Sequence, residues 1–175
     1  INLFNQKPDS LIPDSKKVYT GLEYSIISSS FDKYRKNISE RIDDIKDLLI
    51  IFGGSDPKEI TAHLLELLLE LNTQKNISVV LGPLNRSYEK LSLLKERKLR
   101  NIRIHKNPSD LPKLMSKHQL AFSGSSTTFF ELSFLGIPSI VLPQNDSEKR
   151  FITYLHDKNL VQDPQTSIES RFHNI

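Results

Sequence analysis

Residues 120–142 read LAFSGSSTTFFELSFLGIPSIVL, and this stretch decides the fold that we predict for the whole chain. A short apolar strand leads through six small residues, 123–128, which we call the hydroxyl loop, into a helix. Gly136 and Pro138 then separate that helix from a second apolar strand. The first N–H groups of a helix have no partner within it and carry the positive end of its dipole. We therefore predict an anion site here, with phosphate as the expected anion.

Glu131 lies one turn into the same predicted helix and faces the same end of it. A carboxylate cannot itself bind phosphate, but it accepts hydrogen bonds from hydroxyl groups such as those of a ribose. Without the hydroxyl loop, an ordinary exposed helix residue would be the preferred interpretation of Glu131. Together the two features predict a nucleoside diphosphate bound at the carboxyl end of a parallel sheet.

A second strand–loop–helix unit begins at residues 48–52, LLIIF, an apolar run typical of a strand buried on both faces of a sheet. Gly53, Gly54 and Ser55 follow, and we call residues 53–56 the glycine loop. Its backbone N–H groups can reach the same diphosphate, although a Gly-Gly pair is also an ordinary sharp turn. Asp56 is predicted to cap the next helix, with Pro57 and Glu59 completing a capping box, rather than to act as a catalytic acid. The loop matches neither a P-loop nor the three-glycine dinucleotide motif.

The same alternation runs through the rest of the chain and predicts a Rossmann-like, doubly wound α/β fold, with ligands outside the carboxyl ends of the strands. We divide the chain into an inter-domain segment with a short strand and helix, residues 1–45, and a nucleotide-binding domain, residues 46–175. Further elements are expected as strands at 77–81, 102–104, 120–122, 139–142 and 160–161, and as helices at 87–99, 110–117 (capped by Ser109), 128–135 and 147–158.

Composition excludes several classes of protein. The 175 residues are 37% hydrophobic and 26% charged and contain no cysteine, which is ordinary for a soluble domain and leaves a cytoplasmic setting as the default. No apolar run approaches the roughly 20 residues of a membrane-spanning helix. The net charge of +3 comes largely from residues 90–106, which we interpret as a solvated face, with a membrane-surface or acidic-glycan contact as the alternative. That stretch lacks the aromatic residues that would indicate nucleic-acid binding, and the five histidines show no metal-ligand spacing.

Three strings carry a resemblance to a known family: LIIFGGSDP at residues 49–57, VVLGP at 79–83, and residues 123–145, which contain the hydroxyl loop, Glu131 and LGIPS. They resemble the UDP-sugar hydrolases of pseudaminic acid biosynthesis and the related spore coat polysaccharide biosynthesis proteins of the SpsG type. The resemblance implies a glycosyltransferase-B fold of two Rossmann-like domains. This chain would be the C-terminal one, and the N-terminal domain would lie outside the sequence.

The resemblance also implies roles for individual residues. Glu131 would accept hydrogen bonds from the ribose, and the backbone of Ile104 and His105 would meet the uracil. Gln144 and Asn145 would lie towards the sugar. The diphosphate would be held by the loop that comprises Ser125, Ser126, Thr127 and Thr128.

Two departures qualify what the resemblance implies. Ser125 and Ser126 stand where relatives often have glycines, and the family's catalytic histidine belongs to the N-terminal domain. We therefore predict no catalytic residue, cofactor or metal in this chain, which by itself would bind a uridine nucleotide without turning it over. For the parent protein we expect a UDP-sugar hydrolase of nonulosonic acid or surface polysaccharide biosynthesis. A glycosyltransferase with a UDP-sugar donor is the alternative, and a non-catalytic nucleotide-sugar-binding domain is a third reading.

Overall fold

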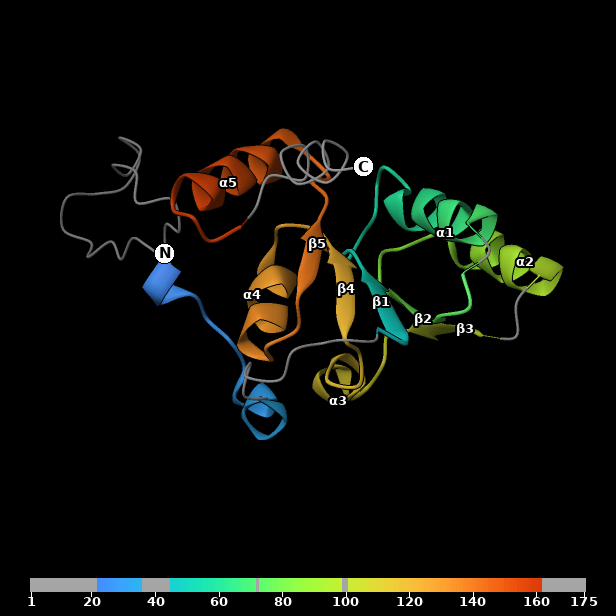
Figure 1. Cartoon of the computed structure of the whole chain (residues 1–175), viewed down its shortest axis with the longest axis horizontal. Helices are drawn as coiled ribbons and strands as arrows, with labels where there is room; N and C mark the ends of the chain where they lie inside the picture. The colour runs from blue at the N-terminus through green and yellow to red at the C-terminus, as the bar shows by residue number, and fades with distance from the viewer. Residues whose placement is uncertain (1–21, 36–44, 72, 99–100, 162–175) are drawn as a thin grey trace, which may run out of the picture. The chain divides into compact units, whose positions relative to one another are not determined.

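The computed structural model describes residues 22–35, 45–71, 73–98 and 101–161 (Figure 1). The chain divides into two compact units, one formed by Ile27–Asn145 and the other by the two end segments Ile1–Ile26 and Asp146–Ile175. All the site residues predicted from the sequence belong to the first unit.

The first unit is built on a five-stranded sheet in the order β3-β2-β1-β4-β5, and every pairing in it is parallel. The chain runs outward from the central β1 through β2 to β3, then returns to the other side of β1 for β4 and β5. The loops after β1 and β4 therefore leave the sheet where the strand order reverses, which is the usual ligand position in doubly wound folds. The predicted fold class is confirmed. The strands are β1 Asp47–Ile51, β2 Asn76–Leu81, β3 Ile102–Lys106, β4 Leu120–Ser123 and β5 Ser139–Val141.

Helices cover both faces of this sheet, and this explains why residues 48–52 are apolar without interruption. Leu48 and Ile50 of β1 pack in one core cluster with residues from α1 (Ile60–Glu70) and α2 (Tyr88–Lys98). Leu49 and Ile51 point the other way. They pack with Met115 of α3 (Leu111–Met115), with Leu132 of α4 (Thr127–Phe134), and with Phe31 of the 3-10 helix η2 (Ser29–Tyr34).

The second unit contains the 3-10 helix η1 (Leu22–Tyr24) and the helix α5 (Asp146–Asp157) among its described residues. Phe151 and Leu155 are the buried residues of α5. No helix within the described residues is long and apolar enough to cross a membrane.

Some predicted elements differ in the structure. The short strand expected within residues 1–45 is not found among residues 22–35, which form two 3-10 helices instead, and residues 160–161 form a bend rather than a strand. Of the helix expected within residues 1–45, the described residues show only η2, and residues 36–44 lie outside the described part of the chain. Helix α3 is capped by Asp110, whose Oδ1 accepts from the Lys113 N–H at 3.1 Å, and not by Ser109. An aspartate one position later fits the helix start better because its side chain reaches the third N–H.

Candidate functional site

The glycine loop and the hydroxyl loop lie against each other at the carboxyl edge of the sheet. Ile51 of β1 pairs with Ser123 of β4, so the two loops begin at the same level. Gly53 adopts a left-handed φ of 79°, and a Cβ atom built on it would lie 3.7 Å from Ser126 Oγ and 3.9 Å from Thr128 Oγ1. The structure thus brings together the two loops that the sequence predicts as one site.

A third loop, which follows β2, supports the glycine loop from its other side. A Cβ atom on Gly82 would lie 2.4 Å from the Gly53 carbonyl oxygen and 2.5 Å from the Gly54 Cα. The Leu84 N–H donates to the Gly54 carbonyl at 3.0 Å. Only glycine fits at position 82, because any side chain there would displace the backbone of the glycine loop. Our sequence-based list of site residues omits Gly82, although a glycine at the end of β2 was a visible signal.

Gly54 is different, because nothing in the structure demands a glycine there. Its φ lies outside the left-handed region, and a Cβ atom on it would meet no atom within 4 Å. Gly54 and the following Ser55 are both exposed. The space over Gly54 is open to a ligand.

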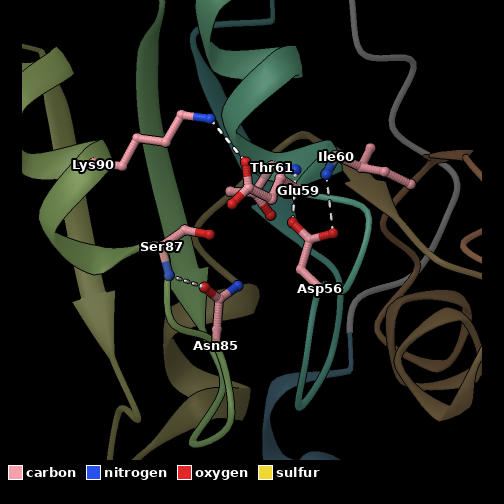
Figure 2. A network of polar contacts seen from close by, with 7 residues as sticks. All are labelled: Asp56, Glu59, Ile60, Thr61, Asn85, Ser87 and Lys90. Atoms are coloured by element: carbon pink, nitrogen blue, oxygen red, sulfur yellow. Dashed lines mark hydrogen bonds and ion pairs between the residues drawn. The ribbon is translucent and has the colours of Figure 1, made fainter.

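The start of α1 is occupied by the protein's own carboxylate (Figure 2). Asp56, which is only 7% exposed, accepts from the Ile60 N–H through Oδ1 at 2.9 Å and from the Thr61 N–H through Oδ2 at 2.8 Å. The predicted role of Asp56 at the helix start is confirmed, but the capping box is wrong. Residues 57–58 form a turn, Glu59 takes a left-handed φ of 51°, and α1 begins only at Ile60.

Glu59 does not turn back towards Asp56 as a capping box requires. Its Oε2 instead forms an ion pair with Lys90 Nζ at 2.8 Å, which links the start of α1 to α2 (Figure 2). This hydrogen bond lowers the pKa of the Glu59 carboxyl and raises the pKa of Lys90. Both groups lie at the surface, where such pairs contribute little to stability. The anion position at the start of α1 is therefore filled by Asp56 alone.

The start of α4 remains open by comparison. Its N-cap residue Ser126 makes no side-chain hydrogen bond to the first turn. Thr127 is exposed, Ser126 is half-buried, and Ser125 and Thr128 are buried. Among the described residues, no carboxylate occupies the first N–H groups of α4 in the way that Asp56 occupies those of α1. The start of α4 lies beside Gly53. Of these two helix starts, only that of α4 can receive an external anion.

Glu131, one turn further along α4, is half-buried. Burial alone raises the pKa of its carboxyl group. Within the described residues, no hydrogen bond or ion pair to this carboxylate is found. A partly desolvated carboxylate without a partner is destabilising, and hydrogen bonds from ligand hydroxyl groups would offset that cost.

Ile104 and His105 lie on β3, which is an edge strand. One side of the β3 backbone pairs with β2, for example Val80 with His105, and the other side faces away from the sheet. The Ile104 side chain packs against a core cluster. The His105 Nε2 atom is buried and has no partner among the described residues, while burial and the charges of Arg103 and Lys117 lower the pKa of this histidine. The uracil contact through this backbone stays a prediction.

Gln144 and Asn145 follow β5, the strand at the opposite edge of the sheet from β3. Asn145 is exposed, whereas Gln144 is 6% exposed and its Nε2 donates to the Phe52 carbonyl at 2.8 Å. The sugar contact of these two residues stays a prediction too. No group of three or more histidine, aspartate or glutamate side chains suited to a metal ion occurs among the described residues.

Comparison with known proteins gives distant relatives. No protein-family model matches the sequence. An uncharacterized protein of Methanocaldococcus jannaschii, MJ1062, is 38% identical over 141 residues, which are 78% of this chain and 29% of that protein. The UDP-N-acetylglucosamine--N-acetylmuramyl-(pentapeptide) pyrophosphoryl-undecaprenol N-acetylglucosamine transferase of Finegoldia magna is 27% identical over 74% of the chain and 36% of its own length. The spore coat polysaccharide biosynthesis protein SpsG of Bacillus subtilis is 24% identical over 76% of the chain and 39% of its own length.

The crystal structure of Acinetobacter baumannii MurG superposes on 86% of this chain with a TM-score of 0.51, at 20% sequence identity and over 42% of the MurG chain. The fold is that of a glycosyltransferase-B domain. The chain spans between 29% and 39% of the length of the three relatives that it matches in sequence. The comparisons support the expected similarity to SpsG and add a similarity to a transferase. They do not support the expected hydrolase of pseudaminic acid biosynthesis, because none of the relatives' names mentions a hydrolase or pseudaminic acid.

Proposed function

We propose that this chain is the nucleotide-sugar-binding domain of a glycosyltransferase that uses a UDP-sugar donor. The observation that carries the proposal is the open start of α4, which lies beside Gly53. One turn inside this helix lies the Glu131 carboxylate, which has no partner among the described residues. A helix start suits a diphosphate, and a carboxylate suits the two hydroxyl groups of a ribose. A nucleoside diphosphate carries both a diphosphate and a ribose.

The relatives support the choice of donor and of reaction class. The Finegoldia magna relative is named as a transferase that acts with UDP-N-acetylglucosamine, and the Bacillus subtilis relative as a protein of polysaccharide biosynthesis. We put the transferase before the hydrolase for this reason. The hydrolase remains a second candidate, favoured by the string FGGSDP at residues 52–57.

In either reaction the role that we propose for this domain is to hold the leaving nucleotide. The first N–H groups of α4 would stabilise negative charge that develops on the diphosphate as the bond to the sugar breaks, without a metal ion. Glu131 would fix the nucleotide by its ribose. We propose that the catalytic base and the acceptor site are supplied by a second, N-terminal domain.

Calorimetry of UDP binding tests this function. We expect the chain to bind UDP, and we expect Glu131→Ala to weaken binding by about 2 kcal/mol, or roughly thirtyfold, because hydrogen bonds to a charged acceptor are lost. The matched control is Glu70→Ala, which removes the same charge from an exposed position at the end of α1 and should leave the affinity unchanged. Equal affinities of wild type and Glu131→Ala would exclude the ribose role, and no UDP binding by the wild type would refute the proposed function.

A further inference from the structure

Two glutamine side chains hold the central strand β1, one at each end. At the amino end, Gln119 Oε1 accepts from the Lys46 N–H at 2.8 Å and from the Asp47 N–H at 2.9 Å. At the carboxyl end, Gln144 Nε2 donates to the Phe52 carbonyl at 2.8 Å across 92 residues of sequence. Both glutamines bond to the backbone, Gln119 as an acceptor and Gln144 as a donor, but only the contact of Gln144 adjoins the glycine loop.

The Phe52 carbonyl belongs to the peptide group that it shares with Gly53. The peptide bonds in the described residues are all trans, so the carbonyl and the Gly53 N–H point in opposite directions within one plane. A hydrogen bond that holds the carbonyl therefore also fixes the direction of the Gly53 N–H. The direction of this peptide matters for the site because Gly53 faces the hydroxyl loop, where a Cβ atom built on it would lie 3.7 Å from Ser126 Oγ and 3.9 Å from Thr128 Oγ1.

The surroundings make this hydrogen bond hard to replace. Gln144 is 6% exposed and Phe52 is 2% exposed. If the amide were removed, water would have little access to the Phe52 carbonyl, and an unsatisfied buried carbonyl is costly. The peptide would be expected to turn towards another donor and to take Gly53 with it.

We propose that Gln144 is a positioning residue of the nucleotide site. It acts through the Phe52–Gly53 peptide, which it holds so that the glycine loop meets the start of α4 in the geometry that binds a diphosphate. This inference rests on the proposed function, and it differs from the sugar-contacting role that family resemblance implies for Gln144. A sugar contact would affect only the sugar-bearing ligand, whereas a positioning role affects the diphosphate itself.

The test compares Gln144→Met with Gln119→Met, which removes the matching side-chain contact from the other end of β1. Binding of UDP and of uridine to each variant is measured by calorimetry or NMR titration. For Gln144→Met we expect UDP affinity to fall by about tenfold and uridine affinity to stay unchanged, since uridine has no phosphate. For Gln119→Met we expect lower thermal stability and unchanged affinity for both ligands.

A second readout does not depend on ligand binding. Because the chain has only six glycines, a sample labelled with ¹⁵N-glycine gives a few resolvable amide signals. Those of Gly53 and Gly54 should shift in Gln144→Met and stay in place in Gln119→Met. If the wild type binds no UDP, the proposed function fails, and these signals still show whether Gln144 positions the loop.

Three results would overturn the inference. The first is unchanged UDP affinity in Gln144→Met together with weaker binding of UDP-N-acetylglucosamine, which would indicate a direct sugar contact. The second is an equal loss of UDP affinity in both variants, which would indicate general destabilisation. The third is unmoved Gly53 and Gly54 signals. If Gln144→Met does not fold, Gln144→Asn, which keeps an amide but shortens its reach, takes its place.

Discussion

Gly54 and Gly82 are neighbours in the structure, yet the same substitution should affect them in opposite ways. A Cβ atom at Gly82 would lie 2.4 Å from the Gly53 carbonyl oxygen and 2.5 Å from the Gly54 Cα, so backbone must move. Overpacking of this kind usually costs 1–3 kcal/mol, and because the obstacle is backbone we expect Gly82→Ala to lower the free energy of unfolding by about 3 kcal/mol. A Cβ atom at Gly54 meets nothing within 4 Å, so we expect Gly54→Ala to be neutral or to stabilise the protein by up to about 1 kcal/mol.

The two variants separate stability from binding. Urea denaturation gives the free energy of unfolding, and calorimetry with UDP gives the affinity. Gly54→Ala should keep full stability and lose about tenfold or more in UDP affinity, because its methyl group enters the space that we assign to the ligand. If it binds UDP as tightly as the wild type, that assignment is wrong. A Gly82→Ala protein of native stability would refute the packing argument for the third loop.

Two further predictions concern the acidic residues. Asp56→Ala should lower the free energy of unfolding by about 3 kcal/mol, because the part-buried Ile60 N–H and the buried Thr61 N–H both lose their acceptor. Asp56→Asn should cost less because the amide keeps one acceptor oxygen. A loss under about 1 kcal/mol for Asp56→Ala in urea denaturation would contradict this. Burial raises the folded-state pKa of Glu131 above its ordinary 4.5, so the free energy of unfolding falls as the pH rises from the unfolded-state pKa through the folded-state pKa. Glu131→Gln should therefore have a higher free energy of unfolding than the wild type at pH 7. Below the ordinary pKa the two proteins should be equally stable. A variant that is less stable than the wild type at pH 7 would show that the carboxylate has a partner in the free protein.

Much of the fold could be predicted from local pattern. Residues 48–52 indicate a central strand because helices cover both faces of a parallel sheet and leave no polar side. The hydroxyl loop and Glu131 could be assigned to one candidate site because both lie within one strand–loop–helix unit and are close in the sequence.

The rest depends on contacts between residues that are far apart in the sequence. A capping box is predicted from the spacing of Asp56, Pro57 and Glu59. In the structure Glu59 instead forms an ion pair with Lys90, 31 positions away, and adopts a left-handed conformation after an extra turn. The glycine requirement at Gly82 and the hydrogen bond of Gln144 likewise involve partners in the segment that follows β1, far away in the sequence. No spacing rule within one segment reports such contacts.

The most direct test of the central claim is the position of the diphosphate, which an NMR titration of the ¹⁵N-labelled chain with UDP measures. We expect the amide signals of Thr127 and Thr128, at the open start of α4, to move most and to move downfield as they donate to phosphate oxygens. The amide signals of Ile60 and Thr61 should stay in place because Asp56 already occupies them. Shifts centred on Ile60 and Thr61, with Thr127 and Thr128 unmoved, would contradict the assignment of the phosphate site to α4.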